Sequence, residues 1–188
     1  MKQQEELKLP LLNRAADILK RGGIVVFPTD TVYGIGCRWD FPKSVERIYQ
    51  IKNTPKTQPF PILVATGSQA KEIAKINETA QKLMDKYWPG TLTIILNIKG
   101  SDQKIGVRLP DSNVTRALIE QVGAPIIGTS ANIHGRGAVR TSKELDPNLI
   151  KQVDYVLEGK CEGGVESTVV DASVDPPKIL RQGAVYLS

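Results

Sequence analysis

Short apolar runs alternate along this chain with stretches in which apolar side chains recur every three or four positions. Residues 12–21 show the helical spacing and are followed by two glycines at 22–23, which favour a helix end. Residues 24–28 form a β-branched run with the length of a buried strand. The helical pattern predicts further helices at 42–52, 68–87 and 114–122, with Asn77 as an N-cap inside the second. The short apolar runs predict further strands at 61–65, 91–97, 105–110, 125–127, 155–157, 167–171 and 178–180.

This alternation predicts an α/β fold built on a twisted, mixed sheet that is flanked by helices. The last third of the chain is rich in strand candidates, which disfavours a purely parallel, doubly wound sheet. No internal repeat and no Gly/Ser-rich linker divides the sequence, so we expect residues 1–188 to form a single domain.

The composition narrows the classes of function. The 188 residues are 40% hydrophobic and 24% charged, which excludes disordered, collagen-like and coiled-coil chains. The net charge of +5 permits an anionic ligand such as a nucleotide or RNA. Because His134 is the one histidine and Cys37 and Cys161 lie far apart, we expect no metal site and no disulfide framework. No apolar run could span a membrane and the first residues do not resemble a signal peptide, so we expect a cytoplasmic protein without membrane partners.

The common nucleotide and hydrolase motifs are missing from the sequence. It contains no P-loop, no complete dinucleotide fingerprint and no G-x-S-x-G motif. Polar clusters instead follow several predicted strands, where α/β folds build ligand sites. In PTDTVYGIG, Asp30 and Thr31 offer hydrogen-bonding groups to a small polar ligand, or they hold a strand-to-loop turn that leads into a glycine-rich turn.

Basic residues mark two further clusters. Lys52 and Lys56 of KNTPKTQP offer positive charge to a phosphate, or they are solvated cations at the end of a helix. Arg108 interrupts the apolar strand IGVRLP. Its guanidinium would grip a carboxylate through two parallel hydrogen bonds, or it would lie on the solvated face of an edge strand.

Two more clusters lie late in the chain. Ser130 and Asn132 of GTSAN present a hydroxyl and an amide that suit phosphate oxygens or a sugar, or they form a cap or an Asx-turn. Ser167 of ESTVVD and Arg181 of ILRQG are candidate ligand contacts, or a strand-start residue and a surface arginine. Each pattern alone is compatible with a purely structural role.

Taken in order, the segments PTDTVYGIG, KNTPKTQP, WPGTLTIIL, IGVRLP, TSAN, ESTVVD and ILRQGAV resemble the YrdC/Sua5 (TsaC) family in its short, single-domain form. The similarity extends over about residues 12–186. It implies a YrdC-like α/β domain whose twisted, mostly parallel sheet surrounds a basic cavity. It also implies the activity of the core members, which are L-threonylcarbamoyladenylate synthases.

The implied reaction is a nucleotidyl transfer. L-threonine and bicarbonate form a carboxylated threonine, which attacks the α-phosphate of ATP and yields threonylcarbamoyl-AMP and pyrophosphate. Downstream tRNA threonylcarbamoyl-transfer proteins use this product to make t6A at position 37 of tRNA, and tRNA itself is a candidate partner. The resemblance implies ATP as a substrate accompanied by Mg²⁺, with no bound prosthetic group.

The resemblance also implies roles for individual residues. It assigns the L-threonine site to Thr31, Arg108, Gly128 and Ser167. It assigns catalysis to Lys52, Ser130 and Asn132. It assigns ATP binding to Lys52, Thr54, Gln58, Lys104, Ser130, Asn132 and Arg181.

The chain departs from the family pattern at Thr54, where the Lys-x-Arg motif has an arginine. A hydroxyl cannot make a bidentate charged contact, so we expect Lys56 or Lys104 to supply the missing cation. The departure keeps a second function open, that of a non-catalytic RNA- or nucleotide-binding relative. Arg108 and Ser167 favour the synthase, because an RNA-binding protein has no need of a threonine pocket.

Overall fold

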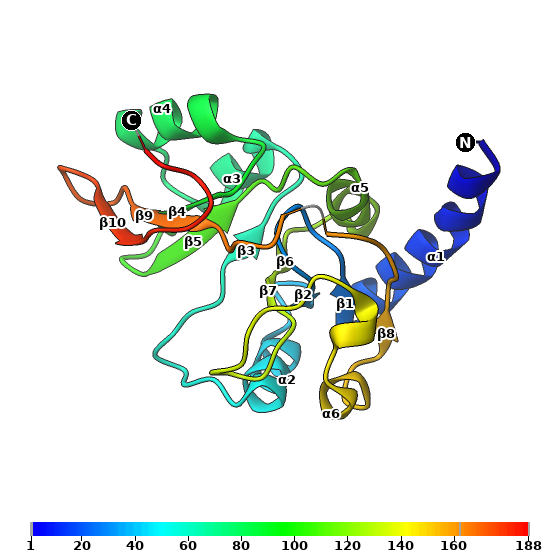
Figure 1. Ribbon diagram of the computed structural model, residues 1–188. Helices are drawn as coiled ribbons and strands as arrows, with labels where there is room; N and C mark the ends of the chain where they lie inside the picture. The colour runs from blue at the N-terminus through cyan, green and yellow to red at the C-terminus, as the bar shows by residue number, and fades with distance from the viewer. Residues whose placement is uncertain (1, 162, 188) are drawn as a thin grey trace.

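The computed structural model describes residues 2–161 and 163–187, which form two mixed β-sheets and the helices that cover them (Figure 1). The helices are α1 (Lys2–Lys20), α2 (Pro42–Lys52), α3 (Gly67–Ile73), α4 (Glu78–Tyr87), α5 (Asn113–Val122), the 3₁₀ helix η1 (Ser142–Glu144) and α6 (Pro147–Ile150). The strands are β1 (Val25–Phe27), β2 (Gly34–Gly36), β3 (Ile62–Leu63), β4 (Leu92–Asn97), β5 (Lys104–Arg108), β6 (Ile126–Ile127), β7 (Thr129–Ser130), β8 (Tyr155–Val156), β9 (Thr168–Asp171) and β10 (Lys178–Arg181).

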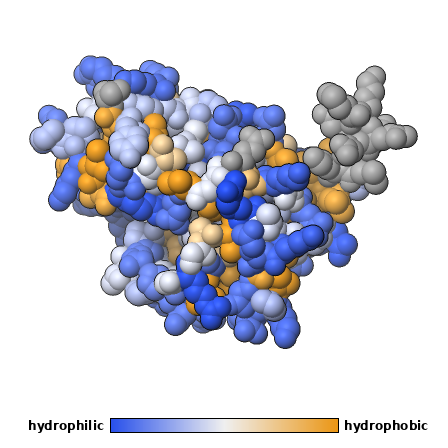
Figure 2. Space-filling model, in the orientation of Figure 1, coloured by the Kyte–Doolittle hydropathy of each residue, from blue (hydrophilic) through white to orange (hydrophobic). Residues whose placement is uncertain are grey.

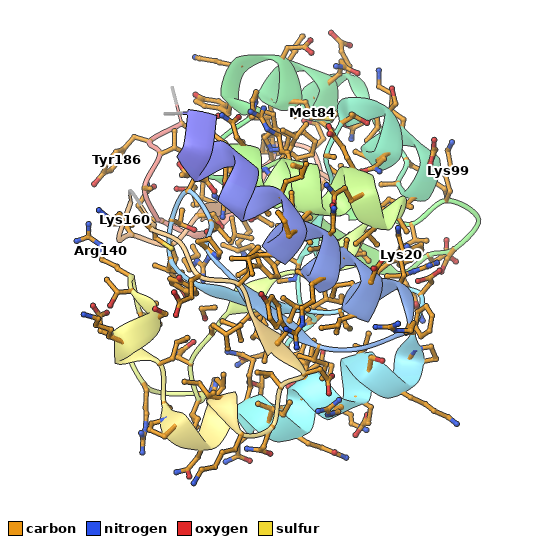
Figure 3. The ribbon with its side chains drawn as sticks, turned by 90° about the vertical axis from the view of Figure 1, so that its right-hand side faces the viewer. Lys20, Met84, Lys99, Arg140, Lys160 and Tyr186 are labelled. Carbon is orange, nitrogen blue, oxygen red and sulfur yellow. The ribbon has the colours of Figure 1, made fainter. Side chains whose placement is uncertain are left out.

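The larger sheet, with the strand order β10-β9-β4-β5-β3-β6, has one packed face and one open face. On the packed face, Leu92, Ile94 and Val170 share a core cluster with Met84 of α4, which Figure 3 labels beneath that helix. Helices α3 and α4 cover this face in Figure 1. Because successive strand residues point to opposite faces, the alternate positions face the other way. These positions are Thr93, Ile95, Gly106, Arg108 and Val169.

The smaller sheet, with the order β7-β2-β1-β8, is covered by helices on both faces. Helices α1 and α5 pack on one face through a cluster that includes Leu19, Phe27 and Ile119. Figure 3 shows α1 lying across α5. Helix α2 covers the opposite face, where Ile48 joins Ile35 in the other core cluster. The end of α2 is thereby fixed beside β2.

The sheet edge at β10 is exposed to solvent. Ile179 and Leu180 of this strand are 46% and 52% exposed, and Figure 2 shows apolar surface over β10. The register shifts between Ile179 and Arg181. Such a bulge blunts an edge strand against pairing with another chain.

The α/β architecture, with mixed sheets flanked by helices, confirms the expected fold class. The expectation of a mostly parallel sheet is wrong. Within the described ranges, three pairs are parallel (β1–β8, β3–β5, β4–β9) and five are antiparallel (β1–β2, β2–β7, β3–β6, β4–β5, β9–β10), in two sheets. The pairs β4–β5 and β9–β10 have connections too short for the crossover that parallel neighbours require.

One strand, β2, was expected as part of a glycine-rich turn. A Cβ atom at Gly36 would lie 1.9 Å from the carbonyl oxygen of Ile127, so this close approach requires glycine. Glycine is uncommon inside strands, so the pattern of apolar residues did not predict this strand.

The helices agree more closely with the sequence. The predicted helix at 68–87 is divided into α3 and α4, and the side chain of Asn77 accepts a hydrogen bond from the backbone N–H of Ala80 as the predicted N-cap. Helix α1 begins at Lys2, well before the expected start at residue 12. None of the helices in the described ranges is both long and apolar enough to cross a bilayer.

Candidate functional site

A cavity of about 410 Å³ lies over the open face of the larger sheet, against β2, β7 and the end of α2. Ligand pockets in proteins have volumes of roughly 300–1,000 Å³. With the exception of Lys104, every residue assigned to the site from the sequence lines this cavity: Thr31, Lys52, Thr54, Gln58, Arg108, Gly128, Ser130, Asn132, Ser167 and Arg181. The fold therefore gathers these residues around one space, while the role of each stays a prediction.

Arg108, at the end of β5, is a buried cation in the floor of the cavity. Its Nε donates to the carbonyl oxygen of Gly90 (2.9 Å), Nη1 donates to Oγ1 of Thr31 (3.2 Å) and Nη2 donates to Oδ1 of Asp30 (2.6 Å). A guanidinium carries five N–H groups, so each terminal nitrogen keeps one N–H without a partner in the described part of the chain. Burial lowers the pKa of Arg108, and the charge of Asp30 opposes that shift. The alternative of an arginine on a solvated sheet face is therefore wrong.

The hydroxyl of Thr31 is oriented by its neighbour Thr29. Oγ1 of Thr29 donates its single hydrogen to the carbonyl oxygen of Val32 (2.7 Å). It must therefore accept from the hydroxyl of Thr31, whose oxygen lies 3.0 Å away. Thr31 then donates to Thr29 and accepts from Arg108. What it still offers to a ligand is an acceptor lone pair.

A second pair of hydroxyls lies across the cavity floor. Oγ of Ser167 and Oγ1 of Thr93 are both buried and 2.8 Å apart. Arg181 binds the same residue, because its Nε and Nη2 donate to the carbonyl oxygen of Ser167 at 3.1 and 2.9 Å. Ser167 thus contacts both Thr93 of β4 and Arg181, a cation that also lines the cavity.

Gly128 follows β6 and provides backbone rather than a side chain. Its N–H donates to the carbonyl oxygen of Pro61 (3.0 Å), so this donor is already used within the fold. A Cβ atom at this position would lie 2.3 Å from Cδ1 of Leu63. Glycine is needed here because the chain passes close to β3.

Lys52 is the last residue of α2, and 4% of it is exposed. Its Nζ donates to the carbonyl oxygens of Ser130 (2.5 Å) and Asn132 (2.6 Å) and to Oδ1 of Asn132 (3.3 Å). Its own carbonyl oxygen accepts from the backbone N–H of His134 (2.8 Å). Burial lowers the pKa of Lys52 to about 8, and the charge of Glu166 opposes this shift. All three N–H groups of the ammonium have partners, so Lys52 ties the segment 130–134 to α2.

The remaining residues predicted to bind ATP differ in whether they line the cavity. Gln58 and Thr54 line the cavity. Oγ1 of Thr54 is the one buried side-chain nitrogen or oxygen atom of the described residues that has no hydrogen-bond partner. Lys104 pairs with Asp171 (3.0 Å) and does not line the cavity. Lys56 pairs with Glu46 on the outer surface of α2 (2.7 Å). Neither lysine lines the cavity, so the structure does not support the expectation that one of them replaces the cation at position 54.

The sequence did not predict Thr29, Thr93 or Glu166 as residues of the site. Thr29 and Thr93 line the cavity and orient Thr31 and Ser167, and the polar position of Thr93 inside the apolar strand TLTIIL was the available signal. Glu166 contributes the single carboxylate among the described lining residues. No three His, Cys, Asp or Glu side chains gather as a metal site within ranges 2–161 and 163–187.

Comparison with known proteins gives a consistent assignment. The sequence profile Sua5_yciO_yrdC, described as "Telomere recombination", matches residues 17–183. The threonylcarbamoyl-AMP synthase of Bacillus subtilis is 33% identical over 187 residues, which are 94% of this chain and 54% of the relative. This chain thus spans about half the length of that enzyme. The uncharacterized protein YciO of Escherichia coli is 30% identical over 92% of this chain and 89% of its own length.

A solved structure resembles the fold closely. The crystal structure of Sua5 from Pyrococcus abyssi in complex with L-threonine has a TM-score of 0.86 and 33% identity. The match covers 92% of this chain and 54% of that one.

Proposed function

The chain belongs to the Sua5/YciO/YrdC family, and we propose that it is an L-threonylcarbamoyladenylate synthase, a nucleotidyltransferase that uses L-threonine, bicarbonate and ATP. The relatives named threonylcarbamoyl-AMP synthase and the threonine complex of a family member support this proposal. Its product would pass to tRNA threonylcarbamoyl-transfer proteins in the cytoplasm for t6A37 synthesis, with tRNA as a candidate direct ligand.

The observation that carries the proposal is the buried guanidinium of Arg108, which lines the cavity and keeps two N–H groups without a partner among the described residues. Such a fork suits the carboxylate of an amino acid, because charge-assisted hydrogen bonds gain strength where water is excluded. Thr31 lies beside it with only acceptor capacity left, so it would face an N–H of the substrate. Ser167, held by Thr93, would bind the side-chain hydroxyl of threonine.

The nucleotide would lie on the side of the cavity formed by Lys52, Ser130, Asn132 and Arg181, with Gln58 nearby. The carbamate oxygen of the carboxylated threonine attacks the α-phosphorus, a new P–O bond forms, and the bond to the β-phosphate oxygen breaks as pyrophosphate leaves. The carbamate is already an anion and needs no general base. Positioning of the two substrates and fixed donors near the phosphate charge would supply most of the rate.

Lys52 has two tasks in this scheme. Its charge lies beneath the nucleotide side of the cavity, and its hydrogen bonds fix the backbone that presents Ser130 and Asn132. A direct contact with phosphate would replace its longest bond, the one to Oδ1 of Asn132 (3.3 Å). We expect Mg²⁺ to accompany ATP.

The proposal is tested by identifying the product. Incubation of the protein with ATP, Mg²⁺, L-threonine and ¹³C-bicarbonate should give an adenylate that contains both threonine and the labelled carbon by mass spectrometry. Absence of this species, with ATP and threonine shown to bind, would contradict the proposal.

One feature favours a second candidate function, a non-catalytic RNA- or nucleotide-binding protein. Thr54 stands where the family pattern has an arginine, and neither Lys56 nor Lys104 lines the cavity. This candidate predicts binding of tRNA or nucleotide without any requirement for threonine, whereas the synthase requires a threonine site that works with the ATP site.

A further inference from the structure

Glu166 occupies an unusual position for a carboxylate, on the side of the cavity that carries Lys52 and Arg181. Within the described ranges it is the single acidic residue of the lining. It also lines an adjoining hollow of about 420 Å³, together with Asn132 and Arg136. An anionic ligand that reached this side of the cavity would meet a negative charge.

Arg181 has hydrogen-bond partners other than Glu166. Oε2 of Glu166 accepts from Nη1 of Arg181 (2.8 Å). The same guanidinium already donates to the carbonyl oxygen of Ser167 from both Nε (3.1 Å) and Nη2 (2.9 Å). Those two bonds hold the guanidinium against the backbone of Ser167, the residue before β9. Glu166 therefore neutralises a cation that is held by other means.

Glu166 acts on the second cation through space. The ammonium of Lys52 gives its three N–H groups to oxygens of Ser130 and Asn132 and makes no hydrogen bond to Glu166. The charge of Glu166 nevertheless favours the protonated form of Lys52 and partly offsets the effect of burial on its pKa. Both cations on the nucleotide side are thus balanced by one carboxylate.

We infer that Glu166 is a resident counter-ion, which a phosphate group of the nucleotide displaces from Arg181 on binding, so that Glu166 sets how tightly the cavity holds anions. The inference rests on the proposed function, because that function places phosphates beside Lys52 and Arg181. The side chain of Glu166 is 41% exposed and can turn into solvent when it is displaced. The displaced carboxylate still repels the ligand, and the repulsion grows with the charge of the ligand.

Glu166→Gln isolates this role because glutamine keeps the size and the hydrogen-bond acceptor but loses the charge. We expect about tenfold tighter binding of ATP, a smaller gain for AMP, and unchanged binding of L-threonine. The gain should shrink as salt is added, since screening weakens repulsion between exposed charges. Glu46→Gln is the matched control, because Glu46 pairs with Lys56 outside the cavity and its loss should leave all affinities unchanged.

The test is calorimetric titration of wild type, Glu166→Gln, Arg181→Gln and the double variant with ATP, AMP, inorganic pyrophosphate and L-threonine. A counter-ion predicts that Glu166→Gln tightens ATP and pyrophosphate binding both alone and in the Arg181→Gln background. If Glu166 instead positions Arg181, the single variant weakens ATP binding and the change disappears in that background, which overturns the inference. Failure of every variant to bind any phosphate compound overturns it too. The expected shift without formation of the threonine adenylate would contradict the proposed function alone.

Discussion

Nη2 of Arg108 lies 2.6 Å from Oδ1 of Asp30, and their side chains are only 8% and 9% exposed. Oδ2 of the same carboxylate accepts from the backbone N–H of Asp111 (3.1 Å). Asp30 does not line the cavity, so it lies behind the guanidinium and balances its charge. A buried cation is tolerated when it is paired and hydrogen-bonded. Asp30 is therefore a positioning residue for the fork that we assign to the substrate carboxylate.

Asp30→Asn should destabilise the fold and weaken threonine binding together. Removal of one partner of a buried ion pair typically costs about 3–5 kcal/mol in the free energy of unfolding. Urea denaturation measures this cost. Asp40→Asn is the control, because the pair of Asp40 with Arg38 is more exposed, and surface pairs contribute about 1 kcal/mol or less. Equal effects of the two substitutions would contradict the role given to Asp30.

Arg108→Ala should chiefly weaken the binding of L-threonine. Truncation of one partner of a desolvated charge pair costs about 2–5 kcal/mol of binding free energy. Calorimetric titration with threonine gives the value, and circular dichroism shows that the variant is folded. Arg116→Ala serves as control, since Arg116 lies on α5 outside the cavity. Unchanged threonine affinity in folded Arg108→Ala would remove Arg108 from the substrate site.

The sequence predicted the elements of the fold better than their arrangement. Local signals such as Asn77 before α4 and the apolar run of β4 determine helices and strands from near neighbours. The division into two sheets depends on pairings such as β1 with β8, whose strands lie far apart in the chain. Local patterns carry no information on such pairings. The strand β2 was missed for a different reason, because two of its three residues are glycines and Gly36 is required by a close contact with Ile127.

The residues of the candidate site were likewise easier to predict than the contacts between them. The order of the short motifs along the chain was enough to select Arg108 and Ser167 as site residues, and both line the cavity. The hydrogen bonds that hold Arg108 and Lys52 in place were not predictable from the sequence. They join Arg108 to Asp30 and Lys52 to Ser130, and each pair is 78 positions apart in the chain. Lys104 was included in the predicted ATP set, but it pairs with Asp171 and does not line the cavity.

Lys52 should make activity fall as pH rises through about 8. Its pKa is lowered to about 8 by burial, and above this pH the ammonium loses a proton and the charge beneath the nucleotide site. The pH profile of the rate measures the effect. Lys52→Arg, which keeps its charge at all accessible pH values, should lose this alkaline decline, while Lys52→Ala should lose most activity at every pH. A wild-type decline that Lys52→Arg retains would assign the titration to another group.

The same lysine has the opposite effect on stability. Between about pH 8 and its ordinary pKa of 10.5, Lys52 is neutral in the folded protein and protonated in the unfolded chain. The unfolded state then binds more protons, so the contribution of Lys52 to the free energy of unfolding rises with pH across this window. Urea denaturation of wild type and Lys52→Met between pH 8 and 10.5 should show a steeper rise in the wild type. A steeper rise in the variant would contradict the lowered pKa.

Thr54→Arg should tighten ATP binding by about tenfold, which corresponds to about 1.4 kcal/mol. The new guanidinium replaces a buried hydroxyl without a partner, and neither Lys56 nor Lys104 already supplies a cation there. Thr57→Arg adds the same charge to the same loop at an exposed position that does not line the cavity, and it should change the affinity little. Equal affinities for all three proteins would show that the cavity needs no cation at position 54.

Under the proposed function, L-threonine, bicarbonate and ATP react together in the cavity, and the decisive measurement is the release of pyrophosphate. The rate is measured with ATP and Mg²⁺ in carbon dioxide-free buffer, with L-threonine and bicarbonate added separately and together, for wild type and Arg108→Ala. We expect release only when both are present, because the attacking carbamate is built from the two. We also expect a large loss of rate in Arg108→Ala at limiting threonine. Equal release with either one omitted would contradict the account and leave an ATPase or a nucleotide-binding protein.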